Sequence, residues 1–295
     1  MAWKIGVDGG GTKTECILVD PSGAVAARHT GPGCSPSLVG AARAREIAAA
    51  ALGALRSGHP EVEVSSTLLC MAGSRAFWRD FGAGLSGFGS TSTVDDSVPV
   101  LELATRGSPG LVLHAGTGSF VAARTPDGEV HYAGGIGWRF GDEGSGYDLG
   151  RRAIARALLE LQGWSEASGL GNLVRVRTGH DTAAAVAGFF YADPATNNGV
   201  AALAPDVLRL ASEGDPAAAE AVSASVLALL ALASRVAERL FPGTLPASFR
   251  AGVSGHILNH PSAFAVLSAK APFPLERVTE PPIEGVRLLL ARTGP

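Results

Sequence analysis

The chain has 295 residues, of which 46% are hydrophobic and 17% are charged, and its formal net charge is −3. This length and apolar content allow one large domain or two ordinary ones, each with a sizeable core. The mild charge, without a basic stripe, predicts no nucleic-acid partner, and three scattered cysteines argue against a disulfide framework or a zinc site.

The first strand begins almost at residue 1, so we predict no signal peptide and a cytoplasmic protein. The most apolar helical run, residues 222–241, contains serines, two arginines and a glutamate, so we predict no membrane partner. We predict that the helix from about Pro216 to Phe241 belongs to the core. Asp215 fits the N-cap of this helix, with proline at its first position. His256 and His260 have a spacing that can suit a metal, but Pro261 disfavours a helix there, so we predict no metal site.

In chain order, the first predicted elements are strands over 5–8, 15–20 and 24–30, which form an antiparallel meander. The turn between the first two strands contains three consecutive glycines, followed by Thr12, Lys13 and Thr14. Glycines allow close approach to backbone N–H groups, which together with hydroxyls can hold phosphate oxygens. Asp8, at the end of the first strand, would suit Mg²⁺ bound through water. The alternative is that this glycine-rich stretch is an ordinary hairpin turn that binds no phosphate.

Two aspartates end a later strand. The stretch "STVDDS" (92–97) places Asp95 and Asp96 just before a predicted helix. Transfer of a phosphoryl group to a hydroxyl needs a proton acceptor, which a carboxylate can supply. Aspartate is also favoured as a helix N-cap. The residues alone leave both interpretations open.

The opening meander recurs 105 residues later without a gap, since residues 7–25 align with 112–130. Gly11 matches Gly116, Thr12 matches Thr117 and Thr14 matches Ser119 in this alignment. Coincidence between small-residue turns is the alternative, but both turns of the meander stay in register. The repeat therefore predicts two similar domains, whose glycine turns could face each other across a cleft and hold a polyphosphate.

A glycine-flanked acidic pair, Asp142 and Glu143, enters a predicted helix in "GDEGSGYDLGRRAI". Such a pair can cap a helix and interact with its dipole. A carboxylate at this place can also accept hydrogen bonds from vicinal sugar hydroxyls. We expect Asp142 to be the functional residue and Glu143 to shape the loop.

Three motifs together resemble the actin, sugar-kinase and Hsp70 ATPase superfamily. "GVDGGGTKT" (6–14) is similar to its first phosphate loop, "HAGTGS" (114–119) to its second, and "FRAGVSGHI" (249–257) to its adenosine motif. The resemblance implies an α/β fold of two ribonuclease-H-like domains, 1–107 and 108–295, with a nucleotide cleft between them. The final "EGVRLLLAR" helix could pack back on the first domain.

The stretch 134–159 narrows the resemblance to the N-acetylglucosamine kinases and the wider BadF/BadG/BcrA/BcrD ATPase family. The resemblance implies an enzyme that uses ATP and Mg²⁺ to phosphorylate the 6-hydroxyl of an amino sugar, N-acetylglucosamine or glucosamine, and a possible homodimer. It implies that Asp96 is the catalytic base and that the sugar contacts Ser35, Asp96, Thr117, Gly118, Gly135 and Asp142. The residues that it implies for ATP are Gly9, Gly10, Gly11, Thr12, Lys13, Thr14, Gly116, Thr117, Gly118, Ser119 and Gly252.

Three residues depart from the pattern of these kinases where the sugar is held. Ser35 stands in the place of an asparagine, Ala72 in that of a serine, and Ile136 in that of a tryptophan. The sequence therefore leaves the acceptor sugar open. It also leaves three rivals open: the activator ATPase of 2-hydroxyacyl-CoA dehydratases, a sugar or nucleotide sensor without turnover, and a glucokinase of the repressor/kinase class.

Overall fold

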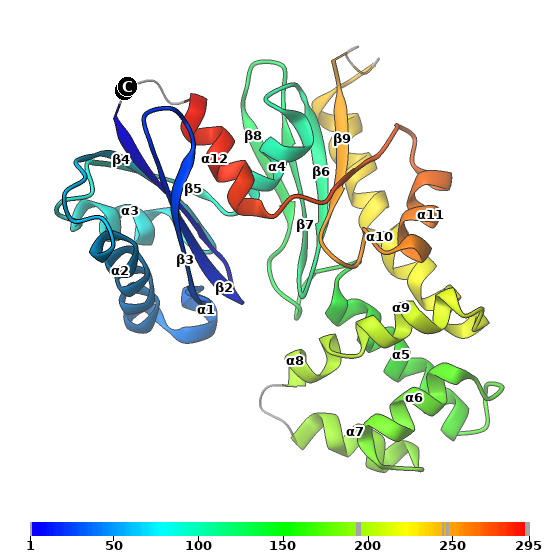
Figure 1. Ribbon diagram of the computed structural model, residues 1–295. Helices are drawn as coiled ribbons and strands as arrows, with labels where there is room; N and C mark the ends of the chain where they lie inside the picture. The colour runs from blue at the N-terminus through cyan, green and yellow to red at the C-terminus, as the bar shows by residue number, and fades with distance from the viewer. Residues whose placement is uncertain (1, 193–195, 244, 246–247, 293–295) are drawn as a thin grey trace. The chain divides into compact units, whose positions relative to one another are not determined.

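The computed structural model describes residues 2–192, 196–243, 245 and 248–292 (Figure 1). The chain forms two compact units. The first ends at Arg106 and takes up the chain again at Glu280, and the second covers Gly107–Thr279. The sequence assigned all residues after 107 to the second domain, whereas the structure counts the segment from Glu280 with the first unit.

The first unit is a five-stranded sheet with helices on both faces. Its strands have the order β3-β2-β1-β4-β5, in which β1, β4 and β5 are parallel and β2 and β3 antiparallel. The expected opening meander is thus confirmed. The elements are β1 (Trp3–Gly9), β2 (Lys13–Val19), β3 (Val25–Pro32), α1 (Pro36–Val39), α2 (Ala41–Ser57), β4 (Val64–Met71), α3 (Arg75–Ala83), β5 (Ser90–Asp95), α4 (Ser97–Thr105) and α12 (Pro282–Arg292).

Strand alternation divides the apolar residues of this sheet between two cores. Cys16 and Leu18 of β2 face the buried side of α2, where apolar residues recur at helical spacing. Ile17 and Val19 point the other way and pack with Val286 and its neighbours on α12. Figure 1 shows α12, in red, beside this sheet and α4. The last helix therefore completes the core of the first unit.

The second unit repeats the same sheet, with the order β8-β7-β6-β9-β10. Here β6, β9 and β10 are parallel and β7 and β8 antiparallel. Its elements are β6 (Gly110–Ala115), β7 (Ser119–Arg124), β8 (Val130–Gly134), α5 (Gly146–Leu161), α6 (Gly169–Thr178), α7 (Ala183–Ala192), α8 (Thr196–Ala201), α9 (Ala204–Ser212), α10 (Pro216–Leu240), β9 (Arg250–Ser254), α11 (Pro261–Lys270) and β10 (Glu276–Val278).

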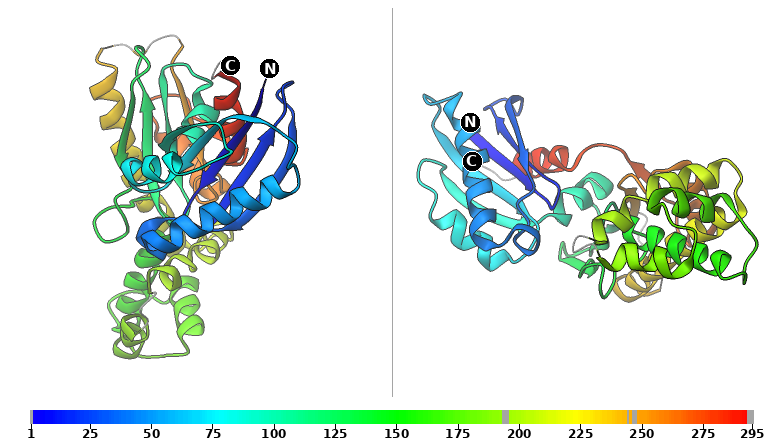
Figure 2. Two further views of the ribbon diagram at one scale, coloured as in Figure 1. Left: turned by 90° about the vertical axis from the view of Figure 1, so that its left-hand side faces the viewer. Right: turned by 90° about the horizontal axis from the view of Figure 1, so that it is seen from below.

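Both sheets thus place a three-stranded meander beside two further parallel strands, which is the ribonuclease-H-like arrangement that the resemblance implies. Helices α5 to α9 occupy the first part of the long connection between β8 and β9, which ends with α10. Figures 1 and 2 show these helices, coloured green to yellow-green, gathered beyond one end of the second sheet. The α/β fold class is therefore confirmed.

Helix α10 is the central helix of the second unit. Its N-cap is Asp215, whose side chain accepts a hydrogen bond from the Ala218 N–H, and Pro216 begins the helix as predicted. Among the described residues, α10 is the one helix long and apolar enough to cross a membrane, but half of its apolar window is buried inside the unit. Burial against the sheet explains its composition, as expected for a core helix.

All three cysteines are buried and free. Cys16 and Cys70 lie on strands. Cys34 follows β3 in a loop, and its side chain packs under the first glycine turn. The N–H of Cys34 donates to the Gly10 carbonyl over 3.0 Å, which holds the loop inward.

Candidate active site

Three parallel strands of the first unit end at one edge of the sheet. The strand register aligns Gly9 of β1 with Met71 of β4, and Met71 with Asp95 of β5. One step earlier, Asp8 pairs with Cys70 in the same way. Asp8 and the two aspartates at the end of β5, Asp95 within the strand and Asp96 after it, therefore meet at one edge, although about 90 residues separate them in the chain.

Burial raises the pKa of both functional candidates at this edge. The pKa of Asp8 rises to about 7, because the carboxyl is buried and because Asp96 and Glu15 add negative charge, while Lys13 acts in the opposite direction. The pKa of Asp96 rises to about 6, first through burial and then through Asp95. Two carboxyl groups with raised pKa at one edge are typical of acid–base or metal chemistry.

Asp96 stands at the N-cap position of α4, yet its side chain makes no capping hydrogen bond. Its neighbour Asp95 is bound by Arg75, whose Nε lies 2.8 Å from Asp95 Oδ1 and whose Nη2 lies 2.5 Å from Oδ2. Asp95 is thus fixed by a bidentate ion pair, while the Asp96 carboxylate is left available. Near its carboxylate, the backbone N–H groups of Asp96 and Ser97 act to lower the Asp96 pKa, although the side chain makes no capping hydrogen bond to the next turn of α4.

The first glycine turn is built from backbone contacts that leave little room for side chains. The Gly10 N–H donates to the Lys13 carbonyl over 3.0 Å and closes the turn. A Cβ on Gly33 would lie 2.1 Å from the Gly11 carbonyl oxygen, so only glycine allows this approach. Gly11, Thr12 and Lys13 remain exposed. The turn therefore presents backbone to solvent on a rigid support.

Ser35 and Ala72, two of the three departures, lie against this turn. The Ala72 N–H donates to the Gly9 carbonyl over 2.8 Å, and Ser35 directly follows Cys34, which is tied to Gly10. The Ser35 side chain is buried, and its hydroxyl lies 3.0 Å from the Ser37 hydroxyl. Both positions therefore belong to the edge that carries Asp8 and Asp96.

The second glycine turn lies between β6 and β7. The Gly116 N–H donates to the Gly118 carbonyl over 2.8 Å, and the Gly146 N–H at the start of α5 donates to the Gly116 carbonyl over 2.8 Å. Burial, with His256 nearby, lowers the pKa of His114 to about 4. A Cβ on Gly116 would lie within 4 Å of both imidazoles. The two imidazoles beside this turn are therefore neutral at neutral pH.

Asp142 lies directly beside the second turn. A Cβ on Gly118 would be 3.2 Å from Asp142 Oδ2, so the carboxylate depends on glycine there. Asp142 has a φ of 65°, a left-handed conformation that aspartate tolerates better than most residues. Burial raises its pKa, while the N–H groups of Ser119 and Gly137 act in the opposite direction. A buried carboxylate held in an unusual backbone conformation suits hydrogen bonding to hydroxyls.

Asp148 is a residue of this region that the sequence reasoning missed. Its buried carboxylate accepts hydrogen bonds from the Gly144 N–H, from Arg151 and Arg152, and from Ser225 of α10 at 2.8 Å. These contacts fix the loop that carries Asp142 to the central helix. The sequence signal was the spacing of Ser145 and Asp148, since the Ser145 hydroxyl caps α5 through the Asp148 N–H.

Three predicted ATP contacts have other roles in the structure. The Thr14 hydroxyl is buried and donates to the Pro32 carbonyl over 2.8 Å, and the Ser119 hydroxyl donates to the Glu143 carbonyl over 2.6 Å. Both hydroxyls stabilise the scaffold behind a turn. Gly252 is buried within β9, where it pairs with Val112. The glycine at the end of that strand is Gly255, whose φ of 87° and close approach to the Ala115 carbonyl place it beside the second turn.

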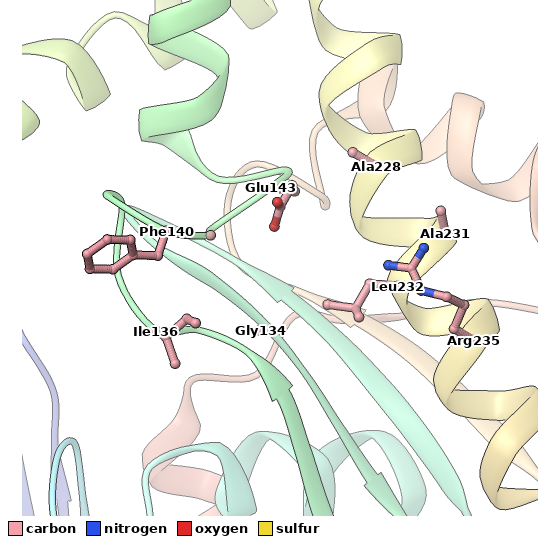
Figure 3. Close-up of a pocket in the computed structure, with 9 residues that line it drawn as sticks. Gly134, Ile136, Phe140, Glu143, Ala228, Ala231, Leu232 and Arg235 are labelled. Atoms are coloured by element: carbon pink, nitrogen blue, oxygen red, sulfur yellow. The ribbon is translucent and has the colours of Figure 1, made fainter.

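Gly135 and Ile136 belong to the loop between β8 and α5. Gly135 has a φ of 64°, and the Tyr132 hydroxyl occupies the place of a Cβ there. Figure 3 shows Ile136 and Phe140 across a pocket of about 420 Å³ from α10. These two side chains are 71% and 81% exposed, which is unusual for large apolar residues.

The residues at the first edge fit Mg²⁺ bound mainly by water and phosphate. No group of three or more metal-binding side chains occurs in the part of the chain that the structure describes. Mg²⁺ keeps several waters and needs only one or two carboxylates beside substrate phosphates. Asp8, a buried carboxyl at the root of the first glycine turn, matches that requirement.

Two ribonuclease-H-like units, each with a glycine turn after its first strand, define the fold of the actin-like class. A family model described as the BadF/BadG/BcrA/BcrD ATPase family matches residues 5–244, and the chain belongs to this family.

The chain is also similar to individual sugar kinases. It is 30% identical over 174 residues to the N-acetyl-D-glucosamine kinase of Dictyostelium discoideum, with 52% of this chain and 53% of that protein covered. It is 31% identical over 167 residues to the N-acetylmuramic acid/N-acetylglucosamine kinase of Clostridium acetobutylicum, with 54% of each covered. The chain therefore spans about half the length of the curated relatives it matches.

A solved structure extends the similarity to the whole chain. The putative N-acetylglucosamine kinase from Chromobacterium violaceum superposes with a TM-score of 0.75 at 27% identity. That comparison covers 98% of this chain and 99% of the other.

Proposed function

We propose that the protein is an ATP-dependent kinase that transfers the γ-phosphate to the 6-hydroxyl of an amino sugar, N-acetylglucosamine or glucosamine. The relatives that carry N-acetylglucosamine in their names support this acceptor class. Ser35, Ala72 and Ile136 are the residues that would adapt the sugar's 2-substituent.

The observation that carries the proposal is the state of Asp96. Its carboxylate has no capping partner, and its pKa of about 6 lets it be ionised at neutral pH and still accept a proton. A general base of this kind is most effective when its pKa lies near the working pH. Asp96 would accept the proton of the 6-hydroxyl as that oxygen attacks the γ-phosphorus.

Other residues would bind and orient the two substrates. Backbone N–H groups of Gly10, Gly11 and Thr12 in the first turn, and of Thr117 and Gly118 in the second, would donate to phosphate oxygens. Asp142 would accept hydrogen bonds from sugar hydroxyls. Asp8 would hold Mg²⁺ through water, and Mg²⁺ would supply charge neutralisation on the phosphates.

A coupled assay of ADP release with Mg·ATP tests the proposal. The acceptors are glucosamine, N-acetylglucosamine, N-acetylmannosamine and glucose, each compared with a reaction that lacks sugar. We expect strong turnover with one of the two named amino sugars. Sugar-independent ADP release, or bound ATP with no release for any sugar, would overturn the kinase assignment and favour an activator ATPase or a sensor respectively.

A further inference from the structure

The edge of the first sheet that carries Asp8 and Asp96 holds two further acidic side chains. Asp95 is the last residue of β5 and directly precedes Asp96, and Glu15 of β2 is the cross-strand partner of Asp8. Like charges at such short range repel one another, and bound ATP would bring further negative charge to the same edge. A carboxylate that takes no part in the transfer would therefore hinder it unless a cation neutralises that carboxylate.

Both of the acids that the proposed transfer does not use are bound by a cation. Lys13 forms an ion pair with Glu15, and Arg75 forms one with Asp95. The two acids that we assign to Mg²⁺ and to the proton have no ion pair among the residues that the structure describes. The ion pairs at this edge thus separate the acids that can react from those that cannot.

The contact between Arg75 and Asp95 occupies both oxygens of the carboxylate. The Arg75 Nε lies 2.8 Å from Asp95 Oδ1, and its Nη2 lies 2.5 Å from Oδ2. The planar fork of a guanidinium matches a carboxylate in this way, which a lysine cannot reproduce. Asp95 therefore cannot turn toward a substrate without losing both contacts. Because Asp96 is the next residue, the fork also restrains the peptide that carries the proposed base.

The helix that presents Arg75 is itself anchored to the same edge. Arg75 is the first residue of α3, and the fully buried Trp78 lies one turn further along that helix. The Trp78 Nε1–H donates to the Ala72 carbonyl over 2.8 Å, and the Ala72 N–H donates to the Gly9 carbonyl over 2.8 Å. The guanidinium is thus held by a segment that is tied to the end of β1.

We infer that Arg75 is a positioning residue of the proposed transfer, which holds the Asp95 carboxylate away from the substrates and leaves Asp96 as the single base. The inference rests on the proposed kinase function and adds to it a residue that touches neither substrate. Without Arg75, the freed Asp95 carboxylate would compete with Asp96 for the 6-hydroxyl and would repel the γ-phosphate.

A double-mutant cycle in the ADP-release assay tests the inference, with whichever of N-acetylglucosamine and glucosamine the wild type phosphorylates. Arg75→Gln should lower kcat by about tenfold, because the base is then misplaced and opposed by a second carboxylate. Adding Asp95→Asn should restore kcat to within about threefold of the wild type, since contacting residues are expected to show such coupling. A merely structural ion pair would give no rescue, because its loss is complete in either single variant.

Two further variants control for charge and for stability. Arg75→Lys keeps the cation without the fork, so it should lose less activity than Arg75→Gln, and it takes the place of Arg75→Gln in the cycle if that variant does not fold. Arg45→Gln removes the exposed ion pair between Arg45 and Asp80 in the same unit and should behave like the wild type. The side chains of Arg75 and Asp95 are 51% and 31% exposed, so we expect all variants to unfold in urea near the wild-type midpoint.

The outcomes separate this inference from the proposed function. An unchanged kcat in Arg75→Gln, or a double variant no more active than Arg75→Gln, would overturn the inference and leave the kinase proposal in place. If the wild type phosphorylates no sugar, the kinase proposal is wrong and the inference is wrong with it.

Discussion

The two glycine turns of the molecule share one backbone design but differ in charge. Thr14 and Ser119 stand at equivalent places in the repeat, and each donates a buried hydroxyl to a carbonyl behind its turn. Asp8, however, aligns with Leu113, a fully buried apolar residue. Both units thus have the same turn scaffold, but the carboxyl group at the end of the preceding strand, Asp8, is present only in the first unit.

The difference extends to the groups around each turn. Two carboxyl groups with raised pKa, Asp8 and Asp96, lie at the edge of the first sheet. Beside the second turn, burial lowers the pKa of His114 and His256, so that both imidazoles are neutral at pH 7, and the carboxyl group there is Asp142. The duplicated fold thus places two acids at the edge of the first sheet and, in the other unit, Asp142 beside two neutral imidazoles.

The largest effect on activity is expected from removing the proposed base, Asp96, which belongs to the first unit. Asp96→Asn should lower kcat by about 10² to 10⁴, because the 6-hydroxyl loses its proton acceptor. ADP release should be measured together with ATP binding, which should persist. Asp80→Asn, an exposed change in the same unit, serves as the control. A loss of less than about tenfold would mean that another group is the base.

The second test addresses the acid of the second unit. Asp142→Asn should lower kcat/KM for the sugar by about 10- to 100-fold, since charge-assisted hydrogen bonds to hydroxyls are lost. Asparagine tolerates the left-handed backbone there, so the fold should persist. The KM for ATP should be unchanged, and Glu129→Gln in the β7–β8 turn is the control. An effect on ATP alone would contradict the assignment.

The pH dependence of the reaction sharpens the contrast in charge. Asp96 must be ionised to accept a proton, so kcat/KM should fall as the pH drops through about 6. One unit below that pKa, activity should be about a tenth of the plateau. In Asp95→Asn this fall in kcat/KM should occur at lower pH. The negative charge of Asp95 raises the Asp96 pKa, so removing that charge lowers the pKa. A flat profile between pH 5 and 8 would exclude Asp96.

A pair of glycine variants tests how tightly the second turn is supported. Gly255 and Gly128 have nearly the same φ, 87° and 89°, but only Gly255 would bring a Cβ within 2.1 Å of a carbonyl oxygen. Each change to alanine should cost about 1–2 kcal/mol of unfolding free energy through backbone strain. Gly255→Ala should cost more and raise the KM for ATP. Equal losses in urea denaturation would show that the close approach is unimportant.

The smallest effects on activity are expected where the two turns are alike. Thr14→Ala and Ser119→Ala should each lower the unfolding free energy by about 1 kcal/mol, the worth of one hydrogen bond. Their KM for ATP should stay unchanged, because each hydroxyl already donates to a carbonyl behind its turn. A raised KM without loss of stability would restore these side chains as phosphate contacts.

The sequence predicted the repeated meander because turn residues and alternating apolar residues are local signals. It likewise placed Asp95 and Asp96 at the junction between a strand and a helix. It could not show that Arg75 binds one aspartate and leaves the other available, because Arg75 comes from a different element. That distinction needs the tertiary structure.

The predicted contacts of Thr14, Ser119 and Gly252 with ATP depend on features that the sequence does not show. Their residue types suit phosphate or adenosine, but their surroundings come from distant segments. The direction of the Thr14 and Ser119 hydroxyls depends on which carbonyl lies nearby in the folded chain. Whether Gly252 lies within a strand or at its end depends on the strand register. Asp148 was missed because its partners, Gly144 and Ser225, meet only when the loop packs on α10.

The return of the chain at α12 has a consequence for how the protein is made. A Cβ on Gly6 would lie 2.5 Å from Val286, so the last helix packs directly on the strand that leads to the first glycine turn. Strand β1 is synthesised early, but the helix α12 that packs on it is synthesised only near the end of the chain. During synthesis one face of the first sheet stays uncovered until the whole second unit has been translated.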